Sequence, residues 1–308
     1  GSLAVMLAIA TTLLLYFKSE LHGWSRSLTR KDLISIFQFA VLSLVVLPIL
    51  PDMDYGPYNA FNPRQAWRMV VLISGLSLAG YAALRFVGDR HGAALLGFFG
   101  GLVSSTATTM VFARHARADP NLIRTATIVI LLANLMVMLR LGLVTAVVAP
   151  SLFMQLAAVL GGGIAFGLAT AVWSWRNLGA PGDHLPMPEV SNPTEIRTAL
   201  SFGLLYAVVL FLAAWLQDVA GSKGIYFVAL ASGLTDVDAI TLSSLRLYNL
   251  EKLGAQQAVF SVALATLSNL AFKSSLIIAI GGGLLARRAL PGLLAIAAGI
   301  GASMFFVV

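Results

Sequence analysis

The sequence predicts an all-α protein that crosses a membrane several times, and its composition and apolar pattern indicate this fold class. Of the 308 residues, 58% are hydrophobic and only 11% are charged, whereas soluble domains carry roughly 25% charged residues. The mean hydropathy is +0.88. A helix needs about 20 apolar residues to cross the hydrocarbon core, and about ten stretches approach that length. They lie at residues 3–17, 34–50, 66–86, 92–113, 125–149, 152–175, 198–217, 224–245, 257–285 and 289–308.

A pattern that recurs along the chain indicates two repeated units of four apolar segments each. The run from Gly101 to Thr109 (GLVSSTATT) resembles the run from Gly233 to Thr241 (GLTDVDAIT), which lies 132 residues later. Each run interrupts an apolar stretch, and many transporters build a site at the membrane midplane from duplicated broken segments. Other matched landmarks are Asn62-Pro63 with Asn192-Pro193, Gly92 with Gly224, Arg114 with Arg246, Asn134-Leu135 with Asn269-Leu270, and Pro150 with Pro291 at a predicted helix start.

The chain therefore divides into an N-terminal helical pair (1–50), a first repeat (51–175), a linker (176–193) and a second repeat (194–308). If the segments 92–113 and 224–245 enter and leave on the same side, thirteen basic residues lie inside and five outside. If all ten segments cross, nine lie on each side, which abolishes the positive-inside bias. The first arrangement also inverts the two repeats, and we prefer it. The alternative is that both segments cross completely as glycine-kinked helices.

Asp236 and Asp238 carry the strongest functional signal in the sequence. A charged side chain at the bilayer centre costs about 2.5–3.5 kcal/mol on insertion scales, so acids at this depth indicate a function. If the backbone unwinds after Gly233, both carboxylates can face one cavity, where they would be ligands for a metal cation or carriers of a proton. The alternative is that one acid caps a helix while the other pairs with Lys273 or Arg140.

Neutral polar residues are predicted to complete the site around these acids. Hydroxyl groups and amides can coordinate a cation or hydrogen-bond the broken segments in place. The alternative for the hydroxyl run is close helix packing through small residues, and the long side chains of Arg140 and Lys273 can instead reach an interface. The predicted neutral shell is Thr235, Ser104, Ser105, Thr106, Thr108, Asn134 and Asn269, with Arg140 and Lys273 as charge partners.

Several function classes find no support in the sequence. The chain has no cysteine, and its histidines, His22, His91, His115 and His184, have no second ligand at a spacing typical of zinc sites. No Gly-rich phosphate loop and no second acidic motif of the kind that intramembrane proteases need are present. The basic residues lie in short loops, which indicates membrane orientation rather than nucleic-acid binding. We therefore expect neither an enzyme nor a cofactor beyond a bound cation.

Part of the chain resembles a known family. The runs Val46–Pro51 (VLPILP), Tyr55–Tyr58 (YGPY) and Met69–Gly75 (MVVLISG), together with Gly100–Thr109, resemble the membrane domain of unknown function 4010, which is found fused C-terminal to MgtC/SapB-type domains. The resemblance implies a membrane protein linked to ions, with an MgtC-like domain as a partner. The segment 3–17 would then be the last helix of that MgtC-like unit.

The combined expectation is a transport protein that moves a cation (Mg²⁺, Na⁺, K⁺ or H⁺) through a midplane site. We expect it in the inner membrane of a bacterium or archaeon, where it contacts lipids. A homo-oligomer is possible. The alternatives are a membrane scaffold or regulatory protein that transports nothing, and an anion channel or carrier, because helix N-termini attract negative charge. Channel and carrier are not distinguished by the sequence.

Overall fold

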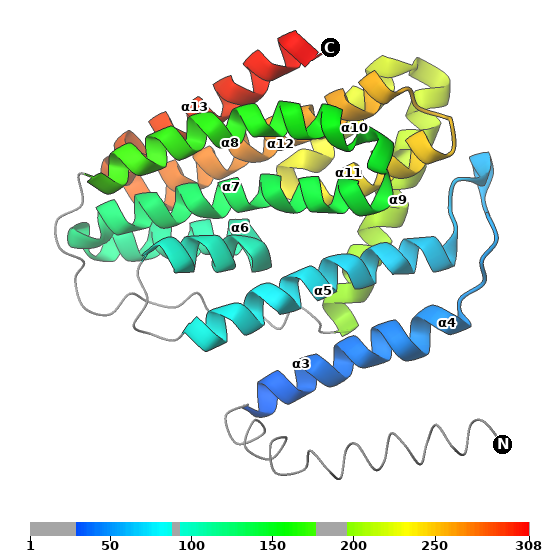
Figure 1. Ribbon diagram of the computed structural model, residues 1–308, viewed down its shortest axis with the longest axis horizontal. Coiled ribbons are helices and arrows are strands. Elements are labelled where there is room, and N and C mark those ends of the chain that lie inside the picture. Colours follow the sequence, from blue (N-terminus) through cyan, green and yellow to red (C-terminus); the bar gives the residue numbers. More distant parts are fainter. Residues whose placement is uncertain (1–28, 88–92, 177–195, 308) are drawn as a thin grey trace.

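The computed structural model describes residues 29–87, 93–176 and 196–307. Within these ranges the regular elements are helices, apart from one isolated bridge between Tyr55 and Phe61. Seven helical stretches are long and apolar enough to cross a membrane, and they pack into an elongated bundle (Figure 1). The chain is therefore a multi-pass α-helical membrane protein, and the predicted fold class is confirmed at this level.

The seven stretches differ from the ten predicted segments for three reasons. The segment 3–17 lies outside the described residues. The segment 224–245 is divided into two helices of 14 and 13 residues, α10 (Ser222–Thr235) and α11 (Val237–Asn249). The last two segments form one apolar stretch, Ala255–Phe306, which comprises α12 (Ala255–Leu276), η5 (Ile277–Gly281) and α13 (Gly282–Val307).

The predicted helix start at Pro291 is wrong, because Pro291 lies inside α13. The helical path changes direction earlier, at Gly282, where φ is 79° and ψ is 177°. Glycine reaches this positive φ without the steric penalty that a Cβ atom would impose. Pro291 removes one backbone N–H, which would otherwise have bonded the carbonyl group of Arg287, and α13 continues past it.

The first described helices are held against α5 (Pro63–Val87) by polar contacts. They are the helix α3 (Arg30–Ala40), the π-helical segment η1 (Val41–Val46) and the short helix α4 (Leu47–Ile49). The short 3-10 helix η2 (Pro57–Asn59) precedes α5. Asp32 forms a capping box with Thr29 and also accepts a hydrogen bond of 2.7 Å from the Tyr81 hydroxyl group on α5. The indole N–H of Trp67 donates to the carbonyl oxygen of Leu42 at 2.9 Å.

The centre of the bundle is α7 (Ile123–Val148), which is the most enclosed of the membrane-length helices. The turn η3 (Pro120–Leu122) joins it to α6 (Ala93–Ala118), and η4 (Pro150–Leu152) joins it to α8 (Phe153–Arg176). α13 lies against α8, where a Cβ atom on Gly163 would approach the Ile300 side chain to 2.7 Å. α9 (Ile196–Ala220) and α12 complete the bundle beside α5 and α10.

Two helical segments are interrupted at equivalent positions of the two predicted repeats. The backbone of α6 becomes extended at Ser104 (φ −164°, ψ 103°), and the backbone between α10 and α11 becomes extended at Asp236 (φ −150°, ψ 125°). These residues are separated by 132 positions, the same offset that relates the two polar runs in the sequence. Each interruption divides its segment into two half-helices.

The α6 segment folds back on itself at Ser104. A Cβ atom on Gly100 would lie 2.8 Å from the hydroxyl oxygen of Thr108, although eight residues of straight helix would rise about 12 Å. The first half runs alongside α7 in the same direction, because Gly97 packs on Val129 and Gly101 packs on Ala133. The chain therefore enters and leaves α6 at the end of the bundle where α7 begins.

The second interrupted segment enters and leaves at the opposite end of the bundle. Ser222, at the start of α10, accepts a hydrogen bond of 2.5 Å from Gln257 at the start of α12. The end of α11 lies near the same place, because only residues 250–254 join it to α12. Asn249 there donates to the carbonyl oxygen of Val148, at the end of α7, at 2.8 Å. The two broken segments thus approach the centre from opposite ends.

Matching glycines let each first half-helix approach a neighbouring helix closely. A Cβ atom on Gly101 would lie 2.6 Å from the carbonyl oxygen of Ala133, and one on Gly233 would lie 2.7 Å from the Cα atom of Ala265. The two contacts are related by the same offset of 132 residues. Because the obstructing atoms belong to backbone, an added methyl group would have to displace a helix.

We predict that Gly233→Ala destabilises the protein by about 1–3 kcal/mol, because overpacking forces backbone shifts. The measurement is the unfolding free energy or melting temperature of the purified chain in detergent. The control is Gly142→Ala in α7, where an added Cβ atom would meet nothing within 4 Å. That control should be neutral or stabilising, by up to about 1 kcal/mol, because alanine is the better helix former. Equal stability of the two variants would contradict the close packing at Gly233.

Candidate functional site

A polar cavity of about 310 Å³ lies between the two helix breaks. Residues of α5, α6, α7, α9, the α10–α11 break and α12 line it, so both repeats contribute. The polar members of the lining are Ser74, Ser77, Ser104, Ser105, Thr106, Arg140, Thr198, Thr235, Asp236, Asp238 and Asn269. Such a concentration of polar groups inside an apolar bundle makes this cavity the candidate functional site.

Each second half-helix begins at the cavity with a side-chain cap. The carboxylate of Asp236 accepts a hydrogen bond of 2.9 Å from the backbone N–H of Ala239, which caps α11. At the equivalent place in α6, the hydroxyl oxygen of Ser104 accepts from the N–H of Ala107 at 3.3 Å. Asp and Ser are both favoured caps because they satisfy N–H groups that have no partner within the helix. The two helix breaks therefore share one local structure but differ by one charge.

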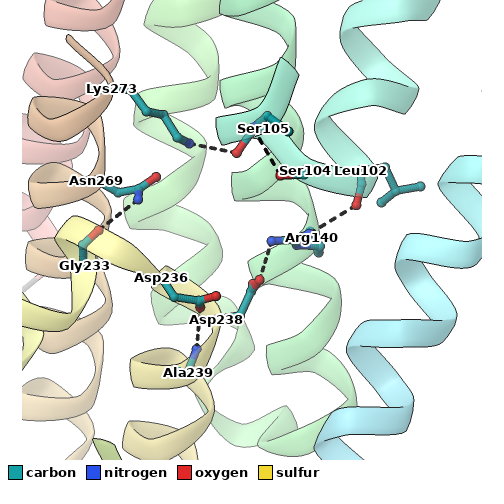
Figure 2. Close-up of polar contacts among 11 residues, drawn as sticks. Leu102, Ser104, Ser105, Arg140, Gly233, Asp236, Asp238, Ala239, Asn269 and Lys273 are labelled. Atoms are coloured by element: carbon teal, nitrogen blue, oxygen red, sulfur yellow. Dashed lines mark hydrogen bonds and ion pairs between the residues drawn. The ribbon is translucent and has the colours of Figure 1, made fainter. Parts of the chain in front are cut away.

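Arg140 of α7 connects the two breaks (Figure 2). Its guanidinium group donates to the carbonyl oxygen of Leu102, just before the α6 break, at 3.1 Å and also pairs with Asp238 Oδ2 in the first turn of α11. Both side chains of the pair are less than a tenth exposed. Asp238 Oδ1 and Arg140 Nε are buried and have no hydrogen-bond partner among the described residues.

Asn269 and Lys273 of α12 hold the breaks from the other side of the cavity. The side-chain amide of Asn269 donates a hydrogen bond of 2.8 Å to the carbonyl oxygen of Gly233, which lies in the last turn of α10. The ammonium group of Lys273 donates to the Ser105 hydroxyl group at 2.8 Å (Figure 2) and to the amide oxygen of Asn134 at 3.0 Å. Lys273 is 1% exposed, so its charge lies inside the bundle and its side chain does not reach an interface.

The structure brings most of the predicted site residues together. Among the predicted neutral residues, Thr108 and Asn134 do not line the cavity. Thr108 donates to the carbonyl oxygen of Ser104, and Asn134 contacts Lys273 and the carbonyl oxygen of Ile130. For the two acids, the observed contacts match the alternative interpretation, in which one caps a helix and the other pairs with Arg140. These contacts engage Asp236 Oδ1 and Asp238 Oδ2, whereas Asp238 Oδ1 has no hydrogen-bond partner within the described part of the chain.

Sequence reasoning missed the residues that α5 and α9 contribute to the cavity. Ser74 and Ser77 are buried in α5 and stand three residues apart, so they share one helix face. Paired hydroxyl groups on one face of an apolar helix were a usable signal. Thr198, near the start of α9, has no comparable signal because it stands in a mixed polar stretch beside Arg197.

The chemistry of the lining suits an ion with a preference for oxygen. Carboxylate, hydroxyl and amide oxygens are hard ligands, which alkali and alkaline-earth cations prefer. Among the described residues, no group of three or more acids, histidines or cysteines is placed to hold a metal ion. Two carboxylates, those of Asp236 and Asp238, line the cavity. The carboxylate of Asp238 is already paired with the guanidinium group of Arg140.

The chain matches the family described as Domain of unknown function (DUF4010) over residues 71–281. All residues that line the cavity fall within this range. A relative described as an uncharacterized protein of Aquifex aeolicus (strain VF5) is 29% identical over 187 residues, which cover 61% of this chain and 81% of the relative. No solved structure matches the chain significantly. The chain belongs to the DUF4010 family, and the link to an MgtC/SapB-type domain stays a prediction.

We predict that Arg140→Gln destabilises the protein by about 3–5 kcal/mol, because it leaves the Asp238 carboxylate buried without a counter-charge. Adding Asp238→Asn to the same chain should recover part of this loss, since the uncompensated charge is then removed. Unfolding of the single and double variants in detergent gives both values.

The control for this prediction is Arg68→Gln. Arg68 pairs with Asp52 at 3.9 Å, and the two side chains are 54% and 40% exposed. Exposed pairs of this kind contribute about 0–1 kcal/mol. The prediction is contradicted if Arg140→Gln and Arg68→Gln unfold alike.

Proposed function

We propose that this DUF4010 protein moves a monovalent cation across the membrane through the cavity between its two helix breaks. The observation that carries the proposal is Asp238 Oδ1, a buried carboxylate oxygen without a hydrogen-bond partner among the described residues, at a cavity also lined by Asp236 and Asn269. Leaving a charged group of this kind unsatisfied is costly. A cation in the cavity removes that cost, because it exchanges part of its hydration shell for these carboxylate and amide oxygens.

An anion is the main competing ligand, because two half-helix N-termini and two buried basic side chains attract negative charge. Both N-termini are already capped, by Ser104 and by Asp236. Lys273 is engaged with Ser105 and Asn134, and Arg140 with Asp238 and Leu102. Arg140 Nε is a buried donor that has no hydrogen-bond partner in the described part of the chain. The acceptor oxygens therefore favour a cation.

The charge balance favours a monovalent cation exchanged for a proton. With Asp236 protonated, the ionised Arg140 and Lys273 and the Asp238 carboxylate leave the cluster with one positive charge before an ion enters. A net charge at this depth is costly, and a divalent ion adds twice the charge of a monovalent one. Release of the Asp236 proton as Na⁺ or K⁺ enters keeps the net charge of the cluster unchanged. We assign Asp236 to this exchange, because its charge is not consumed by a direct ion pair.

The paths of the two broken segments support an inverted repeat around this site. One segment approaches the cavity from the end where α7 begins and the other from the end where α7 finishes. Many secondary transporters use two inverted broken segments that approach a single site from opposite ends. The basic residues then give a positive-inside distribution, as in a bacterial or archaeal inner membrane, and the relative from Aquifex aeolicus is bacterial.

We predict that Asp236→Asn abolishes cation-dependent proton movement. Asparagine caps a helix about as well as aspartate, so α11 should stay in place while the exchangeable charge is lost. The measurement uses the purified chain in liposomes that contain a pH-sensitive dye, with an imposed Na⁺ or K⁺ gradient. The wild-type chain should change the internal pH, and the variant should match empty liposomes.

The matched control is Asp218→Asn, which removes an exposed acid at the end of α9, away from the cavity lining. This control should retain wild-type flux. Wild-type flux in Asp236→Asn would remove this acid from the mechanism. If the wild-type chain moves no cation and no anion, the alternative of a non-transporting scaffold is favoured instead.

We predict that Asp119 and Lys252 lie on opposite faces of the membrane, as the inverted repeat requires. Both residues are exposed in the structure, and the chain contains no native cysteine, so a single cysteine at either position can be labelled cleanly. A membrane-impermeant maleimide added to oriented membrane vesicles should label one position and not the other. Labelling of both positions from the same side would mean that both broken segments cross completely.

A further inference from the structure

A second cavity, of about 430 Å³, lies at the end of the bundle where α7 begins. The start of α7, the last turns of α8 and the first third of α13 line it. We call this cavity the arginine pocket, because Arg124, Arg287 and Arg288 all line it. Thr170, Trp173 and Ser174 of α8 complete its polar wall. It lies apart from the cavity between the helix breaks and shares none of its residues.

The charge of the arginine pocket is one-sided. No acidic residue lines it. Among the described residues, neither Arg287 nor Arg288 forms an ion pair with a carboxylate, and both side chains are exposed. Guanidinium groups present several N–H donors in a planar fork that matches the oxygen atoms of a phosphate group. Arg287 and Arg288 at the wall of one cavity are therefore suited to a phosphate-bearing anion.

The surroundings of the pocket indicate where this anion comes from. Trp173 is 69% exposed, and the neighbouring Val172 and Leu168 on α8 are also exposed apolar residues. Trp is enriched at the level of lipid headgroups, where its apolar ring and polar N–H contact different environments. An apolar helix surface that leads to a basic pocket fits a ligand with acyl chains and an anionic headgroup.

We propose that the arginine pocket binds the phosphate group of an anionic phospholipid. The phosphate oxygens accept hydrogen bonds from Arg287 and Arg288, and the acyl chains lie along the exposed apolar surface of α8. This proposal does not depend on ion transport, because it concerns other residues and another cavity.

The test compares phosphatidylglycerol with phosphatidylcholine as probes. The full chain in detergent is titrated with each lipid, and binding is followed by native mass spectrometry and by the rise in melting temperature. The wild-type chain should prefer phosphatidylglycerol. The double variant Arg287→Gln/Arg288→Gln should lose roughly 10- to 30-fold in affinity for it, since each basic residue contributes about a factor of five near an anionic lipid.

A charge-matched control separates the pocket from the general charge of this end. Arg114→Gln/Arg176→Gln removes the same charge from exposed arginines that do not line the pocket, and it should keep wild-type affinity. Equal losses in the two double variants, or equal affinity of the wild-type chain for both lipids, overturn the proposal. Inorganic phosphate is the third probe; if it binds the wild-type pocket as tightly as the lipid does, the source is free phosphate and the proposal is wrong. Both double variants should melt like the wild-type chain without lipid, and single Arg288→Gln replaces the pair if they do not.

Discussion

The hydrogen bonds and ion pair of Arg140 hold the two helix breaks in one arrangement. Backbone groups at bilayer depth have no bulk water to bond, so an interrupted helix survives there only if other groups satisfy its ends. Arg140 satisfies the carbonyl group of Leu102 in one repeat and pairs with Asp238 in the other. Asn269 does the same for the carbonyl group of Gly233. With these contacts in place, the cavity between the breaks has a defined shape.

The two helix breaks share a local backbone structure, and their difference in charge gives the cavity its character. Ser104 and Asp236 occupy equivalent breaks and cap equivalent half-helices, but only Asp236 brings a negative charge. Lys273 lies on the side of the neutral repeat, where it bonds Ser105. The buried cluster thus combines two acidic side chains with two basic ones. In such a cluster, the entry of one charge is most easily balanced by the departure of another, and this is the physical basis for the proposed exchange.

Much of the architecture could be predicted because it depends on local patterns. Apolar length predicts the helices, and the duplicated run at Gly101 and Gly233 indicates both breaks, since the glycines and hydroxyl groups there weaken a continuous helix. The turn at Gly282 was missed because a proline nearby, Pro291, is the more familiar signal of a helix start. The partner of Asp238 depends on packing between α7 and α11, because Arg140 and Asp238 are nearly a hundred residues apart, and no local pattern encodes it. The α5 lining residues Ser74 and Ser77 were missed although their spacing places both hydroxyl groups on one helix face.

The most direct test of the account is a density map of the protein in lipid, determined with saturating Na⁺ or K⁺ and again without either ion. The account predicts an added density in the cavity, within coordination distance of Asp236, Asp238 Oδ1 or Asn269, only when the ion is present. An unchanged cavity in both maps, with Asp238 bound to Arg140 and no new density beside Asp236, would contradict the central claim that the helix breaks enclose a cation site.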